Sequence, residues 1–248
     1  MQPSDALVVT SFHPDHYELY GRRFLETYIE FMSTPLVVYV ESIEGIPSCE
    51  HDLITFRDLT KVNGMMQVLA MTNFPAARGK LWDGDTLDFR FNVNAFCRKS
   101  FAQIDAAFSH QAAGGKALYW LDADIEFRGA MPLPSVEDTF MLYLGRENYH
   151  SCASFIGWNL TQSCWKEYFD KCWAIYMTGT VFALREWHDS FVNDFLRDVL
   201  SVPAVNLSES LKAEGACNVF DLVFSEATHK KGALKKREIS GESGKPDE

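Results

Sequence analysis

Apolar and polar positions in the N-terminal third of the chain predict strands and helices in alternation. Short apolar runs at residues 6–12 and 36–40 are typical of buried strands, and residues 16–32 between them have helical apolar spacing. This order predicts a parallel strand pair joined by a right-handed crossover. A third strand near residues 53–56 and a helix over residues 59–73 extend the pattern.

The middle of the chain predicts a long helix followed directly by a buried strand. A loop rich in Gly, Pro and Asp covers residues 74–88, and helical spacing then runs over residues 91–112 until Gly114 and Gly115. Residues 117–121 are apolar without alternation, which is typical of a strand buried on both faces. We therefore expect a central strand at this point of the chain.

The second half predicts shorter elements of the same kinds. We expect strands near residues 140–144, 153–158 and 180–184, and helices near residues 162–176 and 187–200. Together these patterns predict an α/β fold with a Rossmann-like, mostly parallel central sheet flanked by helices.

A single domain is expected over residues 1–235, with a flexible tail at residues 236–248. Of the 248 residues 47% are hydrophobic, which is sufficient for a large core. The 23 basic and 34 acidic residues give a formal net charge of −11, which disfavours a broad cationic surface for nucleic-acid phosphates. The chain has no apolar run of transmembrane length and no signal peptide, and its six cysteines form no CxxC pair, so we expect a cytoplasmic protein with reduced thiols.

Two carboxylates follow the predicted central strand, in the sequence Leu-Tyr-Trp-Leu-Asp122-Ala-Asp124. Ligand sites in open α/β sheets lie at the carboxyl ends of the strands. The two side chains can meet at one cation only if the backbone leaves regular strand geometry after Asp122, because alternating residues lie several ångströms apart on one face. The pair then predicts a site for Mg²⁺ or Mn²⁺ with a diphosphate bound to it. The alternative is a helix cap or an ion pair at the strand end.

A second group of polar residues lies near the C-terminus, in Thr-His229-Lys-Lys-Gly232-Ala-Leu-Lys235. A neutral imidazole can be a third metal ligand, glycine lets the backbone approach phosphate oxygens, and lysine offsets the charge of a leaving diphosphate. By itself this spacing is also compatible with an ordinary basic tail.

An apolar strand ending in DxD, followed about a hundred residues later by HxxGxxK, resembles the retaining glycosyltransferases of the glycogenin and lipooligosaccharide galactosyltransferase type. The resemblance implies a GT-A-like fold, with a nucleotide-binding half at residues 1–124 and an acceptor half at residues 125–235.

The resemblance also implies roles for individual residues. Asp122, Asp124 and His229 would hold Mn²⁺, and Gly232 and Lys235 would contact the diphosphate of a nucleotide-sugar donor. The chain departs from the family pattern directly after Lys235, where Lys236 and Arg237 stand in place of the usual Pro-Trp.

Lys99 lies on the predicted long helix, which resembles the helix that these glycosyltransferases place against the nucleotide. Lys99 would then pair with a carboxylate or a phosphate of the donor. The alternative is a lysine on the helix surface.

The resemblance to GT-A glycosyltransferases also implies an acidic residue beside the sugar at this stage of the chain, in the segment Glu186-Trp187-His188-Asp189-Ser190. Asp189 is the first choice, with Glu186 and His188 as alternatives. In a retaining enzyme Asp189 would orient the sugar and stabilise an oxocarbenium-like state; in an inverting enzyme Asp189 or Glu186 would deprotonate the acceptor hydroxyl. Asp189 or Ser190 could also cap the following helix.

Four further residues, in a region rich in loops, are candidates for acceptor contacts, with ordinary core positions as the alternative: Tyr149, His150, Trp158 and Asn159. The expected activity is transfer of a sugar from a nucleotide-diphosphate donor to a hydroxyl of a saccharide, a lipid, a protein or a hydroxymethylated base in viral DNA. A nucleotidyltransferase and a non-catalytic binding module remain as alternatives.

Overall fold

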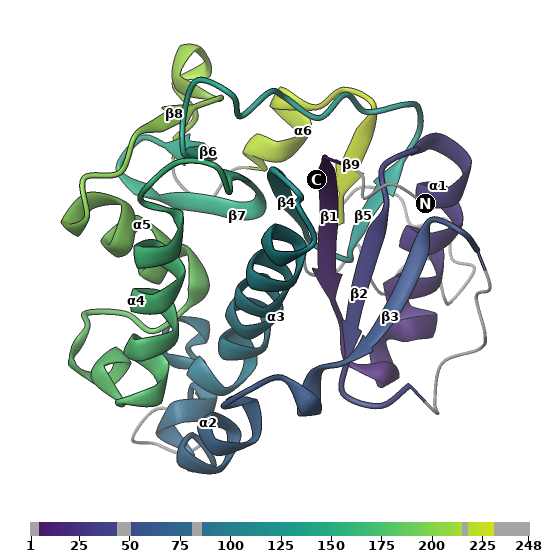
Figure 1. The fold of residues 1–248 in the computed structure, drawn as a ribbon. Helices are drawn as coiled ribbons and strands as arrows, with labels where there is room; N and C mark the ends of the chain where they lie inside the picture. The colour runs from purple at the N-terminus through teal and green to yellow at the C-terminus, as the bar shows by residue number, and fades with distance from the viewer. Residues whose placement is uncertain (1–4, 44–50, 81–85, 215–217, 231–248) are drawn as a thin grey trace, which may run out of the picture.

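The computed structural model describes residues 5–43, 51–80, 86–214 and 218–230. Across these ranges the chain has an α/β fold with a seven-stranded, mostly parallel sheet flanked by helices (Figure 1), which confirms the predicted fold class. The predicted tail at residues 236–248 lies outside the described residues.

The main sheet has the strand order β3-β2-β1-β4-β7-β6-β8. Its strands are β1 (Ala6–Ser11), β2 (Leu36–Val40), β3 (Ile54–Asp58), β4 (Ala117–Leu121), β6 (Met141–Arg146), β7 (Tyr149–Asn159) and β8 (Ala204–Asn206). A separate two-stranded antiparallel sheet consists of β5 (Ile125–Phe127) and β9 (Ala227–His229). The helices are α1 (Arg22–Phe31), α2 (Met65–Met71), α3 (Val93–Ala112), α4 (Trp165–Met177), α5 (Asp189–Val199) and α6 (Val219–Val223).

The order of the parallel strands reverses between β1 and β4. The chain passes from β1 to β2 and β3 on one side, and then crosses back to add β4 on the other side of β1. Strand β7 is antiparallel to both β4 and β6, and β8 is parallel to β6. The carboxyl ends of β1 and β4 therefore flank a topological switch point, which is where open α/β sheets bind ligands.

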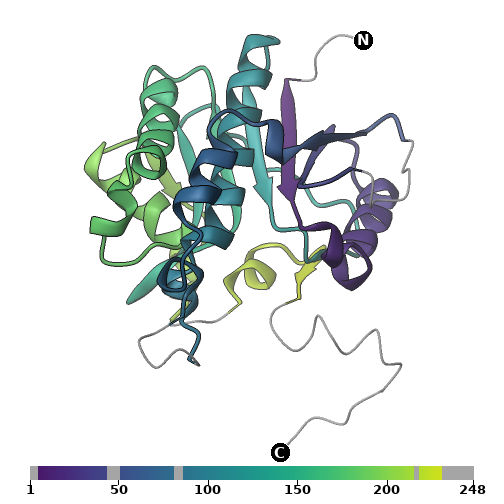
Figure 2. The same ribbon diagram turned by 90° about the horizontal axis from the view of Figure 1, so that it is seen from below.

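Helices cover both faces of the main sheet (Figure 2), and each face has its own apolar core. Successive residues of a strand point to opposite faces, so Val9 contributes to the core with α3, α4 and α5, while Val8 contributes to the core with α1, β5 and α6. The small sheet thus lies on the same side as α1. Because β4, β7, β6 and β8 continue the sheet begun by β1 to β3, both predicted halves share one sheet.

Several predicted boundaries differ from the structure. The strand predicted at residues 180–184 is wrong: Thr180–Ala183 is a 3-10 helix, because Gly179 adopts a left-handed φ of 72° and turns the chain away from the sheet after α4. The helix predicted over residues 59–73 is divided by Gly64, which has a φ of 86°. Strands β5, β8 and β9, of three residues each, were not predicted.

The described residues also bear on membrane spans and on the state of the cysteines. Among them, no helix combines the length and the apolar character that crossing a membrane requires. The four cysteines that the structure describes are free thiols, and Cys97, Cys152 and Cys172 are buried.

Candidate functional site

The fold brings Asp122, Asp124 and His229 together beside the switch point. Asp122 directly follows β4, and His229 is the last residue of β9. The Nε2 atom of His229 lies 3.0 Å from Oδ1 of Asp124 and 3.7 Å from Oδ2 of Asp122. One ligand atom from each residue lies within 4.8 Å of the others. The three residues that the sequence assigned to a metal are therefore neighbours in space.

A turn and the small sheet create this arrangement. The Ile125 amide donates to the Asp122 carbonyl at 3.2 Å, which forms the break in strand geometry that the sequence argument requires. Strand β5 then pairs with β9 in a register that sets Ile125 opposite His229, and the Lys230 amide donates to the Asp124 carbonyl at 2.9 Å. The pairing of β5 with β9 thus carries His229 to the aspartates.

Interactions with both its backbone and its ring fix the position of His229. Its amide donates to Asp221 on α6 at 2.7 Å, and its carbonyl accepts from the Asn218 side chain at 3.0 Å. Burial by itself lowers the pKa of His229, but hydrogen bonds with Asp124 and Cys152 and the charges of the two aspartates raise this pKa to about 9. Without a metal, the ring is therefore a cation between two carboxylates at neutral pH.

Lys99, on α3, contacts Asp122 of the acidic pair and also Asp189. Its Nζ donates to Asp122 and lies 2.7 Å from Oδ1 of Asp122 and 2.7 Å from Oδ2 of Asp189, and it also donates to the Ala153 carbonyl. Burial lowers the pKa of Lys99, but the two carboxylates more than compensate and raise it overall. The alternative of a surface lysine is wrong, because α3 packs against the sheet and only 12% of the side chain is exposed.

Trp120 was not singled out from the sequence, yet it orients Asp122. Its Nε1 donates to Oδ1 of Asp122 at 2.8 Å, and its ring lies under the Lys99 ammonium, 4.9 Å from the ring centroid. Alternation along β4 places residues two apart on the same side, so the sequence did contain this signal. Tyr20 also belongs to this surrounding, because burial and then the charges of Asp124 and Asp122 raise its pKa. It could not be found from the sequence, because the two aspartates lie about a hundred residues further along the chain.

Asp189 is the first residue of α5 and is buried against Lys99. The predicted cap at Asp189 or Ser190 is wrong, because the N-cap residue is His188, whose Nδ1 accepts from the Phe191 amide at 3.4 Å. The Asp189 carboxylate is directed to the Lys99 ammonium instead. Asp189 is thereby coupled to Asp122 through one shared lysine.

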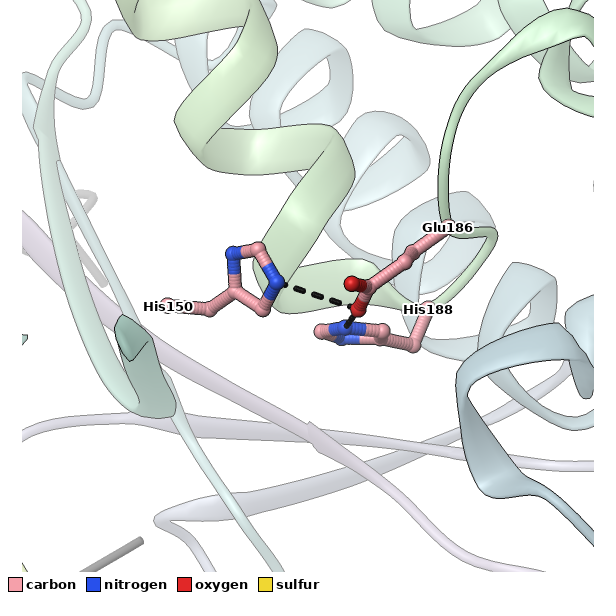
Figure 3. Close-up of side chains that lie close together, drawn as sticks. All are labelled: His150, Glu186 and His188. Carbon is pink, nitrogen blue, oxygen red and sulfur yellow. Dashed lines mark hydrogen bonds and ion pairs between the residues drawn. The ribbon is translucent and has the colours of Figure 1, made fainter. Parts of the chain in front are cut away.

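A second cluster of titratable side chains consists of His150, Glu186 and His188 (Figure 3). His150 comes from the start of β7, whereas the other two lie before α5. The Nε2 atoms of both histidines lie 3.0 Å from Oε2 of Glu186. Burial lowers the pKa of His188, against the opposing charge of Asp189. Burial raises the pKa of Glu186, but the hydrogen bond from His188 and the histidine charges lower it overall.

This second cluster borders a pocket of about 590 Å³. The lining residues are Arg90, Phe91, Asn148, Tyr149, His150, Arg185 and Glu186. Two of the four residues expected near an acceptor, Tyr149 and His150, therefore do line a cavity.

The other two residues of that expectation are core residues. Trp158 has no exposed surface, and the Asn159 side-chain amide is buried and donates to the Val136 carbonyl at 2.9 Å. Both lie on β7 at buried positions, and neither lines the pocket. Gly232 and Lys235 lie outside the described residues.

A scan of protein-family models finds no match to this chain, and a search of curated proteins finds no significant match either. Function is therefore inferred from the side chains and from their positions in the fold.

Proposed function

We propose that the chain is a metal-dependent, GT-A-like glycosyltransferase that moves a sugar from a nucleotide-diphosphate donor to a hydroxyl acceptor. The observation that carries this proposal is the convergence of Asp122, Asp124 and His229 at the switch point of the sheet. Nucleotide ligands of open α/β sheets bind at such points. The resemblance to DxD glycosyltransferases assigns the metal to the same three residues.

The three side chains fit a hard or borderline divalent cation such as Mn²⁺ or Mg²⁺. Two carboxylates and one imidazole converge on one position. Without a metal the carboxylates keep the His229 ring protonated, and a bound cation would replace that proton. When bound, the ion would coordinate diphosphate oxygens of the donor and offset the negative charge of the leaving nucleoside diphosphate.

The residues around this centre hold the ligands in place. Lys99 and Trp120 both donate to Oδ1 of Asp122, which leaves Oδ2 directed to His229. Because the Asp189 carboxylate is buried and paired with Lys99, its arrangement favours orienting the sugar over acting as a base. Glu186 lines the neighbouring pocket and is the better candidate for contact with the acceptor hydroxyl. Gly232 and Lys235 keep their proposed contacts with the diphosphate.

The test is binding of donors in the presence of Mn²⁺. A thermal-shift screen would use a panel of UDP-, GDP-, ADP- and dTDP-sugars with and without Mn²⁺. A donor at about 100 times its Kd would stabilise the fold by about 2.7 kcal/mol, which is several degrees in Tm for a chain of this size. We expect this shift with at least one donor and only when Mn²⁺ is present.

Two variants and one control connect that shift to the site. Asp122→Asn and Asp124→Asn should each abolish the Mn²⁺-dependent shift and the Mn²⁺-stimulated hydrolysis of the donor. Asp170→Asn, which removes an exposed carboxylate paired with Lys166, should leave both unchanged. Full Mn²⁺-stimulated turnover in either aspartate variant would contradict the proposal.

The reaction product separates this activity from the alternatives. Sugar transfer or donor hydrolysis releases a nucleoside diphosphate, whereas nucleotidyl transfer releases pyrophosphate. A structural role of the DxD sequence would give no metal-dependent donor binding.

A further inference from the structure

The second cluster has the geometry of a metal site in which the ligands already face one another. Oε2 of Glu186 lies 3.0 Å from Nε2 of His150 and 3.0 Å from Nε2 of His188 (Figure 3). In a tetrahedral zinc site with metal–ligand bonds of about 2.0–2.1 Å, neighbouring ligand atoms are about 3.3 Å apart. A metal would therefore need the Glu186 carboxylate to move slightly away from both imidazoles, and one ligand atom from each of the three residues already lies within 4.8 Å of the others.

The environment supports His150 as a ligand. Nδ1 of His150 lies 3.8 Å from Oδ2 of Asp194. Asp194 is itself fixed by the Ser151 amide at 2.9 Å, by the Ser151 hydroxyl at 2.5 Å and by Arg197 at 2.7 Å. A histidine that binds a metal through one ring nitrogen usually directs the other to a carboxylate or a carbonyl. Asp194 is the carboxylate on that side of His150, at a distance somewhat longer than a hydrogen bond.

His188 has a different second contact. Its Nδ1 accepts from the Phe191 amide at 3.4 Å, which is a long hydrogen bond. Coordination through Nε2 would place the ring proton on Nδ1, where it would face the Phe191 N–H, so this long hydrogen bond would be lost when the metal–nitrogen bond forms.

One side of the cluster is open. His150 and Glu186 both line the pocket of about 590 Å³, whereas His188 is buried behind them. Catalytic zinc sites combine three protein ligands, including the His₂Glu set, with one position left for water or substrate. A water molecule or a substrate oxygen in the pocket could complete the coordination here.

From these contacts we infer that His150, Glu186 and His188 form a second metal site, which takes a borderline transition-metal ion such as Zn²⁺ and presents an open coordination position to the pocket. Two imidazoles and one carboxylate favour such ions over Mg²⁺ and Ca²⁺, which prefer oxygen ligands. The inference shares Glu186 with the proposed glycosyltransferase, in which this residue would contact the acceptor. It does not depend on that activity, because metal binding here requires neither the donor nor an ion at Asp122, Asp124 and His229.

The experiment is a metal titration of the full chain after removal of metals by a chelator. Zn²⁺ binding is measured by calorimetry, and Co²⁺ is used as a visible-absorption probe, because its absorption is stronger in tetrahedral than in octahedral coordination. The titration is done in excess Mg²⁺ and on the Asp122→Asn/Asp124→Asn double variant, so that the first cluster does not contribute. We expect one equivalent of Zn²⁺ or Co²⁺ to bind, with a tetrahedral-type Co²⁺ spectrum.

Three variants and one control assign the ion. Glu186→Gln keeps the side-chain shape, and His188→Asn keeps a residue that caps helices well. Each of these, and His150→Ala, should weaken binding by at least about 100-fold, because loss of an outer-shell partner alone costs 10–100-fold. His51→Asn, at an exposed histidine outside both clusters, should leave binding unchanged.

Two outcomes would overturn the inference. One is unchanged Zn²⁺ and Co²⁺ binding in Glu186→Gln and His188→Asn, with folding verified by circular dichroism. The other is absence of Zn²⁺ binding in the folded double aspartate variant: if the wild-type chain binds the ion, it belongs to the first cluster, and if neither protein binds it, the second cluster is not a metal site. Failure of the donor screen, in contrast, would affect only the proposed glycosyltransferase.

Discussion

The two clusters contain three side chains each, but they shift the pKa of a buried histidine in opposite directions. In the first cluster, one imidazole lies between Asp122 and Asp124, and the two carboxylates raise the pKa of His229 to about 9 despite its burial. In the second cluster, two imidazoles share the single carboxylate of Glu186, and burial lowers the pKa of His188. Without a bound ion, the larger share of carboxylates in the first cluster therefore favours a protonated histidine, and in the second cluster burial outweighs the single carboxylate and favours a neutral one.

The clusters also differ in how they are connected to the sheet. The first is attached to the end of the central strand β4 and reaches Asp189 through Lys99. The second lies between the start of β7 and the segment before α5, beside the pocket. Since Asp189 directly follows His188, Lys99 is the physical link between the two regions.

The largest expected effect comes from breaking this link with Lys99→Met. The variant leaves the buried Asp189 carboxylate and the partly exposed Asp122 carboxylate without their shared cation, and breaking a buried pair typically costs about 3–5 kcal/mol of unfolding free energy. Urea denaturation measures the change. Lys166→Met is the matched control, because its exposed pair with Asp170 should contribute only about 0–1 kcal/mol. Equal losses in the two variants would show that Lys99 does not stabilise the link.

The next largest effect is expected from Asp194, the carboxylate beside His150 of the second cluster. Asp194→Asn should weaken Zn²⁺ binding by about 10–100-fold, because Asp194 positions His150, and it should leave Mn²⁺ binding unchanged. Isothermal titration calorimetry with each ion gives both values. Asp198→Asn changes a carboxylate that contacts the same Arg197 but is 70% exposed, and it should alter neither affinity. A parallel loss for both ions in Asp194→Asn would mean that the clusters are not independent.

A smaller effect is expected from Trp120→Phe, which changes a residue that positions a ligand of the first cluster, as Asp194→Asn does at the second. It removes the indole donor to Oδ1 of Asp122 while keeping an aromatic ring in the core. We expect Mn²⁺ binding to weaken by roughly tenfold and Zn²⁺ binding to stay the same. Trp173→Phe removes an indole hydrogen bond to the Asn63 carbonyl, remote from both clusters, and is the control. Equal Mn²⁺ affinity in wild type and Trp120→Phe would remove Trp120 from the positioning residues.

The smallest expected effect is a pH dependence of stability that arises from a buried histidine outside both clusters. His110 belongs to neither cluster, and burial lowers its pKa despite opposing hydrogen bonds with the backbone of Asp5 and Ala117. The unfolded chain then binds more protons near its pKa of about 6.5, so the contribution of His110 to stability is fully present above that pH and is lost as the pH falls below it. Urea denaturation at pH 7.5 and 5.5 should show a smaller decrease in His110→Gln than in wild type. An identical decrease would exclude His110 as the cause.

Much of the first cluster could be predicted because its signal is local. An apolar strand without alternation, followed directly by two aspartates, identifies the end of a central parallel strand, and the structure has β4 at the predicted residues 117–121. The second cluster could be predicted only in part. Glu186 and His188 stand out as neighbours in the sequence, but His150 was considered only as an aromatic near an acceptor, because nothing local connects it to a residue 36 positions away.

The sequence by itself determined the α/β class, the four strands β1 to β4 and the position of the acidic pair, because periodicity and strand burial are encoded by neighbouring residues. Only the tertiary structure decided which side chains meet. Strands β5 and β9 have three residues each, too few for a periodic signal, yet their pairing sets His229 against Asp124. In the same way, the packing of α3 on the sheet buried Lys99 between two carboxylates, since contacts across long sequence separations depend on register and packing rather than on local pattern.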